Sequence, residues 1–234
     1  MDIRSFFKSK NGNKNSNQSQ KHGFKYENII RDQVFELPAE SNNTETHDIP
    51  AYMNKFDKTE NCSIKTTGSQ TIFCSDISRF YDYSFNEGVK NTIIVIKYNQ
   101  SETEKIIEKI YEINYNKECH HVLFGNLSKT VIDDYVKKVK SIPRKVGGQE
   151  AKSIFDYIVE KKKLEVIYNF DIQINPKVDS NQTRVQCSIP NFETLLKDFI
   201  IYKSDPSKPN LLRECLIDDR IQSSKRQRNK KVIK

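Results

Sequence analysis

Hydrophobic residues recur along the chain with two different spacings, which predict strands in some segments and helices in others. Residues 92–98, TIIVIKY, are almost entirely apolar and predict a buried strand. Shorter strand-like runs occupy 47–53, 61–67 and 70–75. Gly68-Ser69 is the expected turn between the last two. Together these segments predict a sheet in the first half of the chain.

Helices are predicted where apolar residues recur every three or four positions. The predicted helices are 23–37, 76–83, a segment from Ser101 through Ile113, 128–140, 149–162 and 191–202. Ser101 with Glu104 three residues later has the pattern of a capping box. Further strands are expected at 122–124, 164–175 and 183–189. This order of elements predicts an α/β fold with a mixed central sheet flanked by helices.

Charge narrows the class of partner. Lys and Arg outnumber Asp and Glu by 39 to 31, a formal net charge of +8. Such an excess favours polyanionic partners, nucleic acid before an acidic membrane surface, although it also serves solubility alone. No apolar run is long enough to cross a membrane, and the N-terminus lacks the apolar core of a secretory signal. We therefore expect a soluble intracellular protein without a membrane partner.

The five cysteines are scattered and form no C-x-x-C pair, so we expect reduced thiols rather than disulfides or a zinc ribbon. Cys119-His120-His121 is the one metal-like cluster. On a strand its neighbouring side chains point to opposite faces, which favours an ordinary packing role over zinc binding.

Three residues in the first half of the chain suit phosphodiester hydrolysis. Lys65 lies in the Ser63-Ile64-Lys65 triplet, with Asp48 upstream and Asp76 downstream. Mg²⁺ prefers oxygen ligands and keeps several waters, so two carboxylates and a substrate phosphate oxygen suffice to hold it. The metal lowers the pKa of a bound water, and an ammonium group can orient that nucleophile. The ordinary alternatives are that Lys65 faces solvent and that Asp76 caps the helix after it.

With these residues placed, residues 24–98 resemble the PD-(D/E)xK nuclease superfamily, whose core is a helix, three strands, a helix and a strand. The resemblance implies a restriction-endonuclease-like fold, Mg²⁺ as cofactor and DNA as substrate, and it allows a homodimer. In it Asp48 matches the acid that anchors the metal, and Lys65 matches the lysine beside the scissile phosphate. Ser63 stands where the family has Asp or Glu. Asp76 would supply the carboxylate instead, from the following helix.

Two further acidic residues, Glu27 and Asp57, are candidates for the predicted metal site. Glu27, on the predicted first helix, matches the accessory acid of several family members and is otherwise an exposed helix residue. Asp57, in FDKTEN, is the alternative to Asp48 as metal ligand and is otherwise a turn residue. The leading hypothesis is a magnesium-dependent DNA endonuclease using Asp48, Asp76, Lys65 and Ser63. The alternative is a DNA-binding, replication- or repair-associated protein in which this fold is catalytically silent.

Two other stretches suit a polyanion. Arg144 and Lys145 precede Gly147-Gly148 at a predicted helix start, where backbone amides and the helix dipole favour a phosphate; a plain glycine loop is the alternative. Arg184 and Gln186 alternate on one face of a predicted strand, and these side chains can read guanine and adenine edges. Exposed strand faces also carry such residues routinely.

The two ends of the chain are predicted to lie outside the domain. Residues 8–22 contain no apolar residue and predict a disordered linker within an arm at 1–22. In this arm Ile3, Phe6 and Phe7 resemble the sliding-clamp-binding peptide of replication and repair proteins, without its leading glutamine. The alternative is that they fold back on their own domain.

We place the nuclease-like domain at 23–215 and a basic tail at 216–234. Residues 225–231 within that tail are typical of a nuclear-import signal, a phosphate-binding arm or a solvated terminus.

Overall fold

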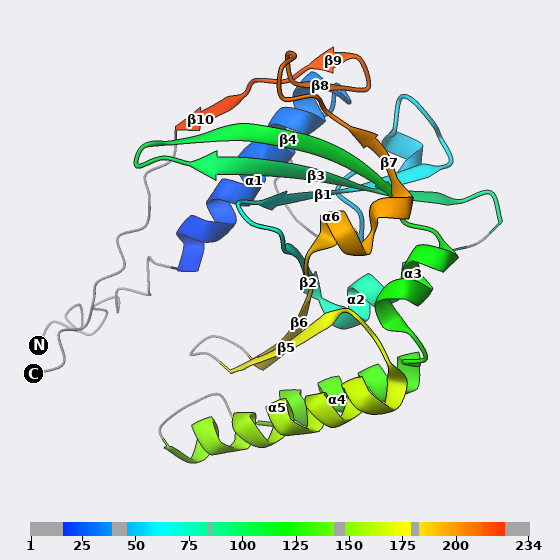
Figure 1. The fold of residues 1–234 in the computed structure, drawn as a ribbon, viewed down its shortest axis with the longest axis vertical. Coiled ribbons are helices and arrows are strands. Elements are labelled where there is room, and N and C mark those ends of the chain that lie inside the picture. The colour runs from blue at the N-terminus through cyan, green and yellow to red at the C-terminus, as the bar shows by residue number, and fades with distance from the viewer. Residues whose placement is uncertain are drawn as a thin grey trace, which may run out of the picture.

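The structure is a computed structural model that describes residues 16–38, 46–83, 85, 87–142, 148–178 and 183–222. Figure 1 shows a curved sheet with helix α1 against it, and a second, smaller sheet that leads down to helices α4 and α5. The architecture is mixed α/β with helices flanking the sheets, which confirms the predicted fold class.

The described helices are α1 (Ser16–Gln33), α2 (Ile77–Tyr81), α3 (Lys117–Phe124), α4 (Lys129–Lys140), α5 (Gly148–Tyr168) and α6 (Phe192–Leu195), with 3₁₀ turns η2 (Ala51–Met53) and η3 (Lys197–Phe199). The described strands are β1 (Glu60–Thr67), β2 (Ile72–Asp76), β3 (Lys90–Gln100), β4 (Glu104–Asn114), β5 (Gln173–Val178), β6 (Thr183–Ile189), β7 (Ile200–Lys203), β8 (Leu211–Leu212), β9 (Cys215–Leu216) and β10 (Arg220–Gln222).

The strands form two main sheets. Sheet A has the order β1-β3-β4-β10, with β7 also pairing β4; β1 and β3 are parallel and the other pairs antiparallel. Sheet B is antiparallel, with the order β2-β6-β5. Strands β8 and β9 form a separate two-stranded ribbon. Although β1 and β2 are neighbours in sequence, they belong to different sheets, so the chain leaves sheet A at the turn between them.

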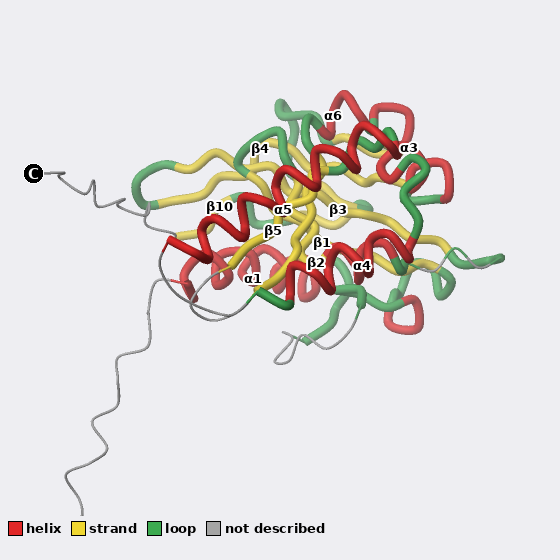
Figure 2. Tube along the Cα trace, turned by 90° about the horizontal axis from the view of Figure 1, so that it is seen from below, coloured by secondary structure: helices red, strands yellow, loops and turns green. Residues whose placement is uncertain are grey.

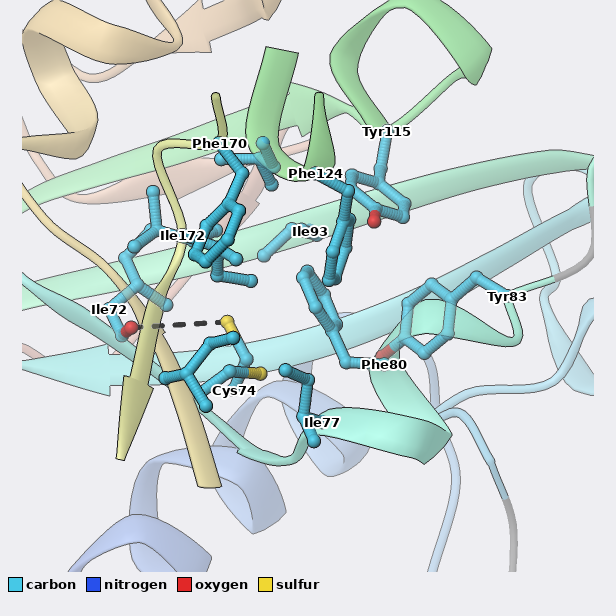
Figure 3. Close-up of a cluster of buried hydrophobic side chains, with 14 of the residues drawn as sticks. Ile72, Cys74, Ile77, Phe80, Tyr83, Ile93, Tyr115, Phe124, Phe170 and Ile172 are labelled. Carbon is cyan, nitrogen blue, oxygen red and sulfur yellow. Dashed lines mark hydrogen bonds between the residues drawn. The ribbon is translucent and has the colours of Figure 1, made fainter. Parts of the chain in front are cut away.

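Sheet A separates two hydrophobic clusters, because side chains alternate across a strand. On one face Tyr26 and Ile30 of α1 pack in a cluster with Ile64 and Ile94. On the other face Val95 belongs to a larger cluster that includes side chains of α2, α3, α4 and sheet B. Part of this larger cluster is drawn in Figure 3, where the Phe80, Phe124 and Tyr115 rings lie between sheet A and the helices.

The segment after Ser101 is a strand, and the predicted helix is wrong. The Ser101 N–H donates to the Glu104 carbonyl oxygen at 2.8 Å, and the Glu104 N–H donates to Ser101 Oγ at 2.9 Å. The two residues of the predicted capping box therefore close the turn of the β3–β4 hairpin. The isoleucines that follow are β-branched, which favours a strand once β3 is available for pairing.

Other predicted boundaries need correction. The differences are that 122–124 belong to helix α3, that α5 continues to Tyr168 so the strand predicted at 164–175 begins only at Gln173, and that the helix predicted at 191–202 stops at Leu195 and gives way to η3 and β7. The strand predicted at 47–53 is reduced to one bridge, Ile49 to Cys62, followed by η2. After that bridge the Ala51 N–H donates to Asn61 Oδ1 at 2.8 Å, and the Met53 N–H donates to the Pro50 carbonyl oxygen at 2.9 Å, so the chain turns into η2 and the pairing ends.

The described domain is longer at both ends than predicted. Helix α1 begins at Ser16, inside the expected linker, and β10 reaches Gln222, beyond the expected boundary at 215. The predicted strands at 61–67, 70–75, 92–98 and 183–189 and the helices at 76–83 and 128–140 are confirmed within a few residues.

A buried ion-pair network attaches the C-terminal part of the chain to sheet A. The Arg213 guanidinium donates to both oxygens of Glu60, at 2.6 and 2.8 Å, and to Glu112 Oε1 at 2.6 Å. Thr92 donates to Glu60 Oε1 at 2.6 Å. All three charged side chains are at most 12% exposed. Although burial raises the pKa of Glu60, its hydrogen bonds to Arg213 and Thr92 give a net lowering.

Replacing Arg213 by Met should lower the free energy of unfolding by about 3–5 kcal/mol, because two carboxylates would remain buried without their cation. Urea denaturation measures this loss. The matched control is Lys208→Met, since the Lys208 side chain is 72% exposed in its ion pair with Asp205 and exposed pairs contribute at most about 1 kcal/mol. Equal stability of Arg213→Met and the wild type would contradict the assigned role.

His120 lies in an aromatic box on helix α3, not on the strand expected for Cys119-His120-His121. Its ring centroid is 4.7 Å from that of Tyr81, 5.1 Å from Phe85 and 4.6 Å from Phe124. Burial, with a smaller contribution from His121, lowers the pKa of His120 to about 4.

All five cysteines are free thiols, as predicted.

The folded pKa of His120 lies below its ordinary value of 6.5, so the unfolded chain takes up the proton first as the pH falls. Stability from neutral His120 is therefore present above pH 6.5 and lost between about pH 6.5 and 4. His120→Phe should remove about 1–2 kcal/mol of that loss, allowing for solvent screening. Unfolding free energies across this range measure it; a variant with the wild-type pH dependence would contradict the assignment.

Candidate active site

The Asp48 carboxylate and the Lys65 ammonium meet at the outer edge of sheet A. Strand β1 is the first strand of the sheet, and a single antiparallel bridge joins its Cys62 to Ile49. Just before that bridge, Asp48 Oδ2 accepts hydrogen bonds from the Ile64 N–H at 2.5 Å and from Lys65 Nζ at 3.2 Å. The side chain of Asp48 thus satisfies a backbone donor of the edge strand and pairs with the lysine next to it.

Helix α1 holds the backbone of Asp48 in place. Arg31 of α1 is 4% exposed, and its Nη1 donates to the Asp48 carbonyl oxygen. Its Nε donates to the Pro38 carbonyl oxygen at 3.2 Å. Asp48 is therefore fixed through its backbone by α1 and through its carboxylate by β1. Sequence reasoning missed Arg31; the available signal was a basic residue four positions after Glu27 on a helix with one apolar stripe.

The Asp48–Lys65 pair is largely removed from solvent, with the side chains 17% and 16% exposed. Burial is the largest single effect on the pKa of Lys65 and lowers it, but the charge of Asp48, the neighbouring Tyr83 and Cys74 and the hydrogen bond to Asp48 together outweigh burial, so the net shift is upward. Lys65 therefore stays an ammonium at neutral pH. It can stabilise negative charge or orient a water, but it cannot serve as a general base.

Ser63 lies two residues before Lys65 on the same face of β1, in a short polar chain. Its Oγ is 2.8 Å from the Tyr83 hydroxyl and 3.3 Å from His47 Nδ1. The His47 and Tyr83 ring centroids are 4.5 Å apart. Burial lowers the pKa of His47 to about 4, against the raising effect of Asp48, and burial also raises the pKa of Tyr83. At neutral pH the three side chains form an uncharged group beside the Asp48–Lys65 pair.

His47 and Tyr83 were not foreseen from the sequence. Tyr83 comes from the loop after α2, and only the tertiary fold brings it to β1. His47 precedes Asp48 directly, and that adjacency was the only signal for it.

Asp76 ends β2 and caps α2. Its Oδ1 accepts a hydrogen bond from the Arg79 N–H at 3.2 Å, which confirms the interpretation of Asp76 as an N-cap. The pKa of the buried Cys187 thiol is raised by burial and by Cys74; the charge of Asp76 raises it further, whereas that of Lys65 lowers it. Asp76 and Lys65 thus lie within electrostatic range of one thiol on β6.

Asp48 and Asp76 offer carboxylate oxygens, the ligands that a hard cation such as Mg²⁺ prefers. Within the described residues, the hydrogen bonds and ion pairs of the Asp48 carboxylate use Oδ2 and those of Asp76 use Oδ1, so each acid keeps a second oxygen. In the same part of the chain no group of three or more His, Cys, Asp or Glu side chains is placed to hold a metal. Mg²⁺ is often held by one or two carboxylates plus waters and phosphates, so the remaining oxygens of Asp48 and Asp76 are of the donor type that it prefers.

The other predicted acids have different roles. Asp57 Oδ1 accepts from the Thr59 N–H at 2.8 Å, and its Oδ2 pairs with Lys90 at 2.8 Å, as expected for the turn interpretation. Glu27 is 8% exposed on α1, so the alternative of an exposed helix residue is wrong. It lies one helical turn before Arg31.

The predicted DNA and partner residues divide into two sets. Arg184 and Gln186 lie two positions apart in β6, so the expected strand is confirmed and both side chains lie on one face. Arg144, Lys145, Ile3, Phe6 and Phe7 lie outside the described residues.

The chain matches no protein-family model, and comparisons with curated proteins and with solved structures found no match either. Among the described residues, no helix has the length and apolar character needed to span a membrane.

Proposed function

We propose that this chain is a magnesium-dependent endonuclease that hydrolyses phosphodiester bonds in DNA. The observation that carries the proposal is the largely buried Asp48–Lys65 pair at the edge of a mixed sheet, in which Asp48 is fixed by Arg31 from one side and by the Ile64 N–H from the other. A carboxylate and an ammonium held together in this way suit the binding of a cation and a phosphate side by side. The net charge of +8 supports a polyanionic substrate.

Each residue has a distinct task in the proposed reaction. Asp48 and Asp76 would hold Mg²⁺ through the oxygens left over from their structural hydrogen bonds. The bound ion would supply Lewis-acid polarisation of the phosphate and a more acidic water. Lys65, which stays protonated, would orient the attacking water and stabilise charge that develops on the phosphoryl oxygens. Ser63 would contribute a neutral hydroxyl, held by Tyr83 and His47, where related nucleases have an acid.

The second candidate function is DNA binding without cleavage. Two observations favour it: Ser63 leaves β1 without the carboxylate that the resemblance requires, and Asp76 is engaged in capping α2. In this case Asp48 and Lys65 would be a structural pair that closes the sheet edge. The two functions differ in whether Mg²⁺ converts bound DNA into cut DNA.

Supercoiled plasmid incubated with Mg²⁺ should be nicked or linearised by the wild type, and Lys65→Ala should cut about 100- to 1,000-fold more slowly. Asp48→Asn should be similarly impaired, because the amide oxygen can still accept from Ile64 but carries no charge for the metal. DNA binding without metal should persist in both variants. Lys208→Ala, which changes an exposed lysine, is the control and should cut normally.

Two results would contradict the endonuclease proposal. One is an absence of cutting by the wild type across Mg²⁺ concentrations with DNA bound. The other is cutting by folded Lys65→Ala at the wild-type rate, since any activity would then lie elsewhere.

A further inference from the structure

Sheet B has one polar and one apolar face. The register of its outer pair sets Gln173 opposite Ser188, Asn175 opposite Gln186 and Lys177 opposite Arg184. Ser188 Oγ donates to Gln173 Oε1 at 3.2 Å and accepts from Asn175 Nδ2 at 3.1 Å. Since directly opposed side chains share a face, these six polar residues lie on one face of the sheet, which we call the polar ribbon face; Ser188 in it is only 1% exposed.

The opposite face of the same strands is buried. Ile174, Val185 and Cys187 are at most 2% exposed. Helix α4 packs on β6 and α5 packs on β5, and Figures 1 and 2 show both helices on one side of the strands. The polar ribbon face is therefore turned away from α4 and α5. Gln173 and Lys177 are exposed, and Asn175, Arg184 and Gln186 are partly exposed.

Strand β2 connects the polar ribbon face to the candidate active site. In the register of β2 and β6, Phe73 is opposite Ser188 and Asp76 is opposite Gln186. Phe73 is 60% exposed although its neighbours Ile72 and Cys74 are buried. Asp76, a proposed metal ligand, thus lies beside Gln186, at the middle pair of the polar ribbon face.

The chemistry of this face matches base edges and phosphates. It carries the amides of Gln173, Asn175 and Gln186 with the cations Arg184 and Lys177, and the sequences of β5 and β6 contain no Asp or Glu. Asn or Gln binds adenine through N6 and N7, and Arg binds guanine through O6 and N7. A two-stranded antiparallel ribbon also fits the width of the major groove of B-DNA.

We propose that the β5–β6 ribbon enters the major groove of duplex DNA, where Asn175, Arg184 and Gln186 read base edges and Lys177 contacts a phosphate. The substrate class is then double-stranded DNA recognised by sequence. The inference deepens the proposed function, and it rests on that function only for the cut that follows recognition. Phe73 lies beside Ser188, at the end of the polar ribbon face away from Arg184.

The test is a binding selection with the Lys65→Ala protein without metal, so that cleavage plays no part. A pool of random duplexes is bound, recovered and sequenced, and the preferred site is measured in a titration. Gln186→Ala and Arg184→Ala, each added to Lys65→Ala, should relax preference at one or two base pairs by about tenfold or more. Thermal melting confirms that the variants fold.

Lys177→Ala should act differently. It should weaken binding about equally for all sequences and reduce the slope of log K against log salt by about 1. Lys208→Ala is the matched control for loss of one exposed lysine outside the ribbon, and it should leave the selected sequences unchanged.

Unchanged sequence preference and affinity in folded Gln186→Ala and Arg184→Ala would overturn the ribbon proposal, whether or not the wild type cuts DNA. Stronger binding to single strands than to duplex would also overturn it. If the parent protein selects a defined duplex sequence and these variants lose that preference, the ribbon proposal is supported, even if the wild type never cuts DNA. In that case only the proposed catalysis would fail.

Discussion

The placement of Asp48 is the constraint on which the candidate site depends. Its carbonyl oxygen is bound by Arg31 of α1, and its carboxylate is bound by the Ile64 N–H and by Lys65 of β1. The bridge between Ile49 and Cys62 fixes the segment next to it. A short irregular segment thus acquires a defined position, because a buried backbone donor and a largely buried cation both need this acceptor. The same contacts that complete the sheet edge set an acid beside a lysine.

Sheet A and sheet B adjoin near the Asp48–Lys65 pair, because β1 of sheet A is followed in the chain by β2 of sheet B. Ser63 and Lys65 lie on the face of β1 opposite to α1, and the chain then crosses through the turn at Gly68 into β2 of sheet B. Sheet B in turn presents Asp76 and the polar ribbon face. A site for the phosphate and a surface for the bases would therefore belong to two sheets that share one hydrophobic cluster. This arrangement lets a rigid core position both, as functional surfaces require.

The sequence was informative where local signals agreed with the final pairing. The apolar run of β3, the cap of α2 and the proximity of Asp48 to Lys65 follow from residue type and spacing. The strand β4 was missed because Ser101 and Glu104 suit a helix start and a hairpin turn equally well, and only pairing with β3 decides between them. Arg31 and Tyr83 reach the site through tertiary contacts, which spacing along the chain does not encode.

A crystal structure of the protein with Mg²⁺ and a DNA duplex would test the proposed site directly. We expect one Mg²⁺ bound by carboxylate oxygens of Asp48 and Asp76 at about 2.0–2.1 Å, with Lys65 Nζ within hydrogen-bonding distance of the scissile phosphate or its attacking water. A structure with DNA bound in which Mg²⁺ avoids Asp48, or in which the phosphates pass far from Lys65, would contradict this expectation.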